Sequence, residues 1–147
     1  MRTVPEQVSD WTVELTQLLN ENFKKYSIKM LETYTSDYAT KRTKRIKDGT
    51  EKLTQFVIRP GRKYYKINQQ EWENGEYRDT SVHCFVDKNT GEVYKPKSWK
   101  GPEKKSRYDL RIIKEREFAF KNVDWAGGWL YTRFFHCANQ RQEVEVN

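Results

Sequence analysis

The sequence predicts a single α+β domain over residues 1–147, in which an N-terminal helix or helix pair packs on a four-stranded antiparallel meander and a short C-terminal helix completes the layer. Apolar residues recur at helical spacing near the N-terminus, whereas strand-like alternation begins at Leu53. Helices that precede the strands, rather than alternating with them, favour α+β over α/β. The expected parts are residues 1–50 (helical), 53–95 (antiparallel sheet), 106–137 (C-terminal helix and aromatic closure) and 139–147 (frayed tail).

The first helix is expected from about Pro5 to Lys24. Thr3 followed by Glu6 is typical of a capping box. One apolar face follows, comprising Val4, Val8, Trp11, Leu15, Leu18, Leu19 and Phe23. The segment Tyr26–Tyr38 fits a second helix at least as well as a strand, and Asp37–Asp48 is either a basic helix or a mobile basic loop.

Turn signals divide the middle of the chain into strands. Pro60-Gly61 predicts a hairpin, Asn74-Gly75 a second turn, and Asp87–Gly91 a third. In the strand Tyr77–Val86, alternation places Val82, Cys84 and Val86 on one face and His83 and Phe85 on the other. A fourth strand is expected from Glu92 to Lys95.

The C-terminal part is expected to be a linker followed by a helix. Lys95–Arg107 contains two prolines and a glycine and is interpreted as linker-like. Ser106 would cap a helix from Arg107 to about Lys121. Beyond this helix, Trp125 and Trp129 are expected to close one end of the core rather than to form an exposed anchor for a partner.

Composition predicts a compact basic protein with an anionic partner. Charged residues make up 33% of the chain, hydrophobic residues only 35%, and aromatic residues 14%, so the core is expected to use few but large side chains. The formal net charge is +7, which suits nucleic acid, an acidic protein or an anionic membrane. No apolar run is long enough to cross a membrane, and no secretory signal precedes Asp10. We therefore expect a cytosolic protein with reduced thiols.

The cations concentrate in two runs. Lys41–Lys66 has a net charge of +8, and Lys95–Arg107 has +5. Clustered cations beside aromatic rings are typical of nucleic-acid binding, because phosphates pair with the cations and bases stack on the rings. The alternative is a solvated face that keeps the protein soluble. The predicted site comprises Lys41, Arg42, Lys44, Arg45, Arg62 and Lys63 as phosphate contacts, with one of Tyr64 or Tyr65 as a stacking ring.

Other candidate sites are weaker. His83-Cys84 and His136-Cys137 supply the residue types of a zinc site, but adjacent strand residues face opposite ways, so no metal is predicted. His83 near Glu76 or Glu92 could act in acid–base cleavage of RNA, yet a hydrogen-bonded surface histidine is the simpler interpretation. We therefore predict no enzyme and no cofactor, with a small nuclease as a distant alternative. The loop after Asp87 lacks the spacing of a calcium site.

Several strings of residues carry a resemblance to a known group of proteins. They are Gly61–Ile67, Ser81–Pro96, Ser98–Pro102 and Asp124–Gly128. Their pattern resembles small uncharacterised proteins of tailed phages of marine bacteria and cyanobacteria. The resemblance implies a viral origin and a place of action in the cytoplasm of the infected bacterial host. That group has no assigned activity, so the resemblance implies no functional residue.

Two functional hypotheses follow. The first is a non-enzymatic phage accessory protein that binds nucleic acid through the Lys41–Lys66 and Lys95–Arg107 surfaces. The second is a protein-interaction module that uses the same surface for an acidic host protein or acts within the virion. The first hypothesis requires cations that lie far apart in the sequence to converge in one positive region.

Overall fold

The structure is a computed structural model that describes residues 2–131. Two helices come first, five strands follow, and a short helix and a 3-10 turn end the described chain. In order these elements are α1 (Val4–Glu32), α2 (Asp37–Asp48), β1 (Gln55–Pro60), β2 (Tyr64–Glu73), β3 (Glu76–Asp87), β4 (Glu92–Pro96), β5 (Pro102–Asp109), α3 (Ile113–Asn122) and η1 (Gly128–Leu130). The α+β class is confirmed.

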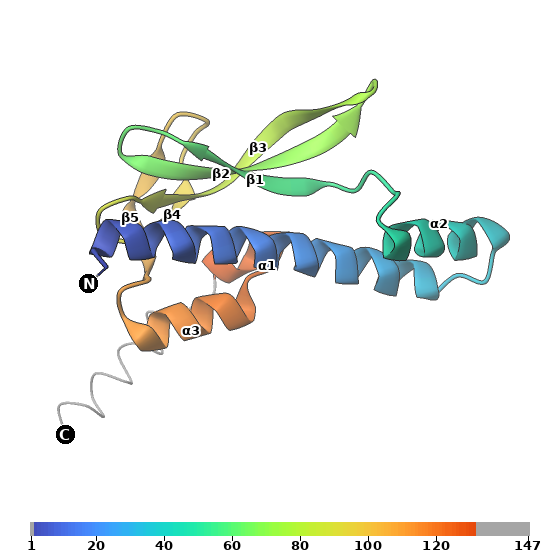
Figure 1. The fold of residues 1–147 in the computed structure, drawn as a ribbon, viewed down its shortest axis with the longest axis horizontal. Coiled ribbons are helices and arrows are strands. Elements are labelled where there is room, and N and C mark those ends of the chain that lie inside the picture. The colour runs from blue at the N-terminus through green and yellow to red at the C-terminus, as the bar shows by residue number, and fades with distance from the viewer. Residues whose placement is uncertain (1, 132–147) are drawn as a thin grey trace.

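The strands form one antiparallel meander with the order β1-β2-β3-β4-β5. Figure 1 shows α1 along one face of this sheet and α2 beside the C-terminal end of α1. The turn between β1 and β2 and the turn between β4 and β5 lie near one end of the sheet, and α2 lies at the other end. The prediction of four strands is wrong, because the meander has a fifth strand.

The N-terminal helix begins as predicted and extends further than predicted. The Thr3 hydroxyl accepts the Glu6 N–H at 3.3 Å, and the Glu6 carboxylate accepts the Thr3 N–H at 3.3 Å, so the capping box is confirmed. The helix continues past Lys24 to Glu32. The first part of the ambiguous Tyr26–Tyr38 segment is therefore helical, and no strand forms there.

The basic segment Asp37–Asp48 is a helix rather than a mobile loop. The Ser36 hydroxyl accepts the Ala39 N–H at 3.1 Å at its start. Gly49 ends the helix with φ at +79°, a left-handed conformation that glycine adopts without strain. Ala39 and Ile46 are buried, so the cations of α2 face outward.

The fifth strand comes from the segment interpreted as a linker. Residues 97–101 form the turn between β4 and β5, in which the N–H groups of Lys97 and Ser98 both donate to the Gly101 carbonyl. Ser106 lies opposite Tyr94 in the sheet and caps no helix. The helix α3 instead begins at Ile113, after a residue without a side-chain cap. The linker prediction is wrong because the two prolines stand at the ends of strands, where their missing N–H costs nothing. The helix prediction is wrong because β5 continues through Ser106 to Asp109.

A register shift in β3 reverses the expected placement of His83. Ile67 of β2 lies opposite Cys84, and the next residue, Asn68, lies opposite Val82, so His83 has no partner in β2. Such a bulge turns an extra side chain toward one face. The His83 ring packs against Phe56 at 5.2 Å between centroids, on the core side. The prediction that His83 and Phe85 share a face is therefore wrong.

The core lies between α1 and the inner face of the sheet. Trp129 is 1% exposed and stacks on Tyr108 at 5.3 Å, and Trp125 packs edge-on against Phe23 at 5.1 Å, so the predicted aromatic closure is confirmed. The predicted tail, 139–147, lies outside the described residues. The buried side chains of the core are Val8, Leu15, Leu19, Phe56, Ile67, Cys84, Val86, Val93, Tyr108, Leu110, Ala119, Val123, Trp129 and Leu130.

The edge strand β1 is closed by a side chain of α1. The Phe56 N–H donates to Asn20 Oδ1 at 2.7 Å, and Asn20 Nδ2 donates to the Phe56 carbonyl at 3.1 Å. Pro60, at the end of the same strand, has no N–H to offer. The edge is therefore protected against pairing with a second chain.

Removing the two hydrogen bonds between Asn20 and Phe56, which we call the Asn20 clamp, is expected to destabilise the fold. The Asn20→Ala substitution leaves the half-buried Phe56 N–H without its partner, and we expect the free energy of unfolding to fall by about 1–2 kcal/mol. Urea denaturation measures this loss. Gln17→Ala, at an exposed position of the same helix, is the control and should change stability by less than about 0.5 kcal/mol. Equal stabilities of the two variants would contradict the role of the clamp.

Candidate nucleic-acid interface

The outer face of the sheet, which points away from α1, carries both polar and aromatic side chains. Tyr65 and Ile67 of β2 face the core, so Tyr64 and Lys66 point to the outer face. In β3, Phe85 lies opposite Lys66 and shares that face. Of the two tyrosines predicted as stacking rings, Tyr65 therefore packs on the core and Tyr64 does not.

A hollow of about 370 Å³ opens on this face beside the turn between β1 and β2. We call it the basic hollow. Five of the residues that line it are cations, and no lining residue carries a carboxylate. It is lined by Arg59, Pro60, Gly61, Arg62, Lys63, Tyr64, Lys66, Phe85 and Lys100.

Aromatic rings contact two of the lysines of the basic hollow, Lys63 and Lys66. Phe85 is only 2% exposed, because Tyr64 packs on it at 5.8 Å between ring centroids and Lys66 Nζ lies 5.8 Å from its centroid. Lys63 Nζ lies 5.3 Å from the Tyr64 ring. Such contacts attract an ammonium group to a ring face. The lysines are therefore partly positioned before any ligand arrives.

Arg59 is the one cation of the hollow with a carboxylate partner. Its Nε and Nη2 donate to Asp79 at 3.1 and 3.2 Å, and Asn68 and Gln70 donate to the same carboxylate at 2.8 and 2.6 Å. The hydrogen bond from Arg59 holds the pKa of Asp79 well below its usual range. Within residues 2–131, no carboxylate forms an ion pair with the other four cations, which are Arg62, Lys63, Lys66 and Lys100.

The predicted site residues of α2 lie apart from this hollow. Lys41 pairs with Asp37 at 3.0 Å, and Arg42 and Arg45 share Glu51 at 3.1 and 3.3 Å. Lys44 lines a separate hollow between α1 and α2. Figure 1 places α2 at the opposite end of the sheet from the turn between β1 and β2. The structure therefore divides the expected positive region, and only part of it surrounds the basic hollow.

The structure adds residues that the sequence prediction left out. Lys66 and Lys100 line the basic hollow, and Trp99 of the turn between β4 and β5 lies with its ring centroid 4.8 Å from Lys66 Nζ. Both Trp99 and Lys100 belong to the second basic run, Lys95–Arg107, which marks them in the sequence. The sequence does not show that a hairpin between β4 and β5 brings this run close to Lys66 of β2.

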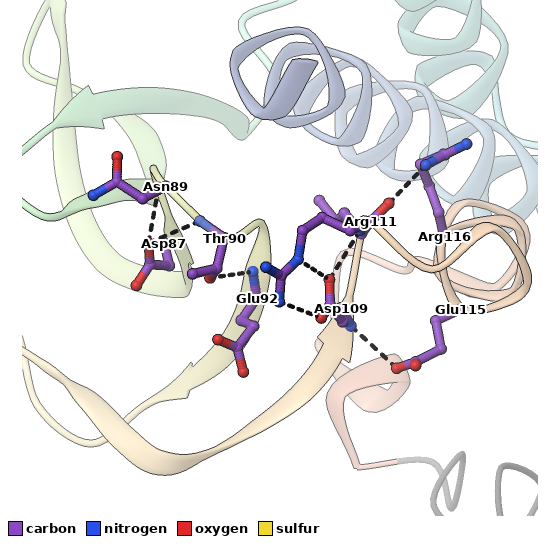
Figure 2. A network of polar contacts seen from close by, with 9 residues as sticks. Asp87, Asn89, Thr90, Glu92, Asp109, Arg111, Glu115 and Arg116 are labelled. Carbon is purple, nitrogen blue, oxygen red and sulfur yellow. Dashed lines mark hydrogen bonds and ion pairs between the residues drawn. The ribbon is translucent and has the colours of Figure 1, made fainter. Parts of the chain in front are cut away.

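The carboxylates near the third turn serve structural roles (Figure 2). Asp87 Oδ1 accepts the N–H groups of Asn89 and Thr90 at 2.8 and 3.1 Å, so the predicted hairpin turn is confirmed. Asp109 forms an ion pair with Arg111 at 2.7 Å. In the described chain, no group of three or more His, Cys, Asp or Glu residues is placed to hold a metal ion. The predicted pair His136-Cys137 lies outside that range.

His83 is part of the core and accepts a hydrogen bond from an indole. Its Nε2 accepts the Trp129 Nε1–H at 2.9 Å, and its side chain is one of the buried polar groups, with the residue 8% exposed. Burial lowers its pKa to about 4. The adjacent Cys84 is fully buried, which raises the pKa of its thiol. The interpretation of His83 as a surface residue is thus wrong.

These features define a small α+β protein whose five-stranded meander carries a cationic hollow on the face opposite its long helix. The chain belongs to DUF7717, a family of unknown function whose sequence pattern matches residues 1–132. No curated protein and no solved structure matches the chain. None of the helices in residues 2–131 is long and apolar enough to cross a membrane.

Proposed function

We propose that the protein is a non-enzymatic accessory protein that binds nucleic acid through the basic hollow. The observation that carries this proposal is a cavity of about 370 Å³ lined by five cations and no carboxylate. Arg62, Lys63, Lys66 and Lys100 are the proposed phosphate contacts. The resemblance to phage proteins supports a place of action in the cytoplasm of an infected bacterium.

The physical basis is release of counterions from the phosphate backbone. Each phosphate that a lysine or arginine neutralises frees condensed counterions, so affinity for nucleic acid falls steeply with salt. Arg59 contributes less than the other four cations, because Asp79 already balances its charge. Arg42 and Arg45 of α2 are not included in the proposed contact, because they share the carboxylate of Glu51 and α2 lies at the opposite end of the sheet.

Salt dependence is the direct test. Four phosphate contacts on a single strand predict a slope of about −3 for log affinity against log salt, which is about a 50-fold loss between about 50 and 200 mM. Fluorescence anisotropy of a labelled oligonucleotide measures the slope. Binding that is absent, or that does not change with salt, would contradict the proposal.

Poly-glutamate serves as the control for the second hypothesis, in which the partner is an acidic protein. We expect poly-glutamate to displace the oligonucleotide poorly at equal charge, because its carboxylates are not spaced along a phosphate backbone. Equal displacement by both polymers would instead favour an acidic protein as the partner.

A further inference from the structure

We propose that the ligand of the basic hollow is a single-stranded nucleic acid and that Trp99 stacks on one of its bases. This inference rests on the proposed function and makes it more specific. It assigns the stacking ring to a residue outside the predicted pair, Tyr64 and Tyr65. Three features of the outer face carry it, namely the exposure of Trp99, its rigid turn and its position between two hollows.

Trp99 exposes its indole ring to solvent on a hydrogen-bonded turn. It is 48% exposed. The turn beneath it is held by the Lys97 and Ser98 N–H groups on the Gly101 carbonyl, at 3.0 and 3.1 Å. The Lys100 N–H adds a bond to the Ser98 hydroxyl at 3.2 Å. An aromatic ring held in this way gains contact area at little cost in conformational entropy.

Lys66 links the basic hollow to Trp99. Its Nζ lies 4.8 Å from the centroid of Trp99 and 5.8 Å from that of Phe85, which lines the hollow. A second hollow, of about 300 Å³, is lined by Trp99 together with Ser81, Val82, Pro96, Lys97 and Ser98. Trp99 therefore stands between a cationic hollow and a nearly uncharged one. A phosphate in the first places the base of a neighbouring nucleotide within reach of the ring.

The two predicted rings are less suitable for stacking. Tyr65 packs against the core. Tyr64 is half-buried and is surrounded by Phe85, Tyr94 and Lys63, with ring centroids 5.8 and 5.9 Å away for the first two. Stacking needs a ring with a free face, because the base lies flat against it. Any base can stack in this way, whatever its identity. In a duplex these faces are covered by neighbouring base pairs, so an open indole selects the single strand.

Trp72 provides a matched control. It is 40% exposed, and Lys52 Nζ lies 5.0 Å from its ring, so it resembles Trp99 in both respects. It belongs to the far end of β2, away from the basic hollow. Trp99→Ala is expected to weaken binding of a single strand of about 12 nucleotides about tenfold. Trp72→Ala should change the affinity less than twofold, or about 0.4 kcal/mol.

Three readouts separate stacking from loss of charge or fold. The salt slope of Trp99→Ala should equal that of the original protein, because no phosphate contact is removed. Trp99→Phe should restore most of the affinity, since a smaller ring still stacks. A duplex of the same sequence should bind about tenfold more weakly than the single strand at equal salt.

The outcomes distinguish this inference from the proposed function. If the protein binds nucleic acid but Trp99→Ala behaves like Trp72→Ala, or the duplex binds as tightly as the single strand, the single-strand inference is overturned and the proposed function stands. If the unchanged protein binds neither, both are overturned.

Discussion

Replacing the four unpaired cations of the basic hollow with glutamine is expected to weaken binding of a single-stranded oligonucleotide about a thousandfold at about 50 mM salt. The substitutions are Arg62→Gln, Lys63→Gln, Lys66→Gln and Lys100→Gln. Within the described chain these side chains have no carboxylate partner, so their charge is available to phosphates. Losing four contacts removes almost the whole salt slope of about −3, and the counterion contribution to affinity disappears with it.

A control with the same net charge separates the site from overall charge. The four substitutions lower the net charge from +7 to +3. Four exposed cations near α2 give the same final charge when replaced with glutamine, and this control should retain its affinity within about threefold. Equal losses in the two variants would show that binding follows net charge rather than the hollow. The control positions are Lys29, Lys41, Lys44 and Lys47.

The hollow variant needs a check of the fold, because Lys66 contacts two aromatic rings, and the control variant is checked in the same way. Far-ultraviolet circular dichroism and thermal unfolding provide it. A surface lysine usually contributes little to stability, so the melting temperature is expected to change by only a few degrees. A fully unfolded hollow variant would move the test to Arg62 and Lys63 alone, which lie in the exposed turn and should together remove about half of the slope.

The start of α1 and the end of α2 were predictable because their signals are local. Thr3 and Glu6 fix the start of α1, and Gly49 fixes the end of α2 through its own backbone conformation. The end of α1 was not predictable, since no glycine or proline marks it and Tyr26–Tyr38 has apolar residues at both helical and strand spacing. Its packing against α2, which follows from tertiary contact, decides that segment.

The fifth strand and the bulge could not be predicted from local pattern. Charged residues occupy both faces of β5, as in Glu103 and Lys104, so the alternation that marks a half-buried strand is missing. The bulge at His83 depends on how β3 pairs with β2, and no residue of β3 signals it. One skipped residue moves a side chain to the other face, which is why a correctly predicted strand still gave a wrong placement.

Only part of the candidate site was predictable, because the rest depends on how distant segments of the chain pair. Arg62 and Lys63 flank a turn that the sequence signals clearly, and the structure keeps them together. Charge density along the chain says nothing about pairing, so it does not reveal that Arg42 and Arg45 share the carboxylate of Glu51. Lys100 was left out because its approach to β2 depends on the hairpin between β4 and β5.

Stability is expected to fall as the solution is acidified below neutrality, because His83 is held neutral in the core. Burial lowers its pKa from 6.5 to about 4 in the folded protein. Between these two values the unfolded chain binds a proton that the folded protein does not, so the stabilising contribution is complete above pH 6.5 and is lost as the pH falls toward 4. The expected loss is about 2 kcal/mol between about pH 7 and pH 5, and about 3 kcal/mol by pH 4.

The His83→Gln variant isolates this contribution. Glutamine does not titrate, so the variant lacks the His83 slope, and its carbonyl can still accept the Trp129 indole N–H. The variant loses the ring contacts with Phe56 and Trp129, so it is less stable at neutral pH. Urea unfolding at several pH values should show the two stabilities converging as the pH falls from about 7 to 5. Parallel curves would contradict the burial of a neutral imidazole.

An NMR titration of the unchanged protein gives a second measurement, because the His83 imidazole should remain neutral at about pH 5, well below its ordinary pKa. Carboxylates contribute little to the difference in that range, since most of them stay ionised at and above pH 5.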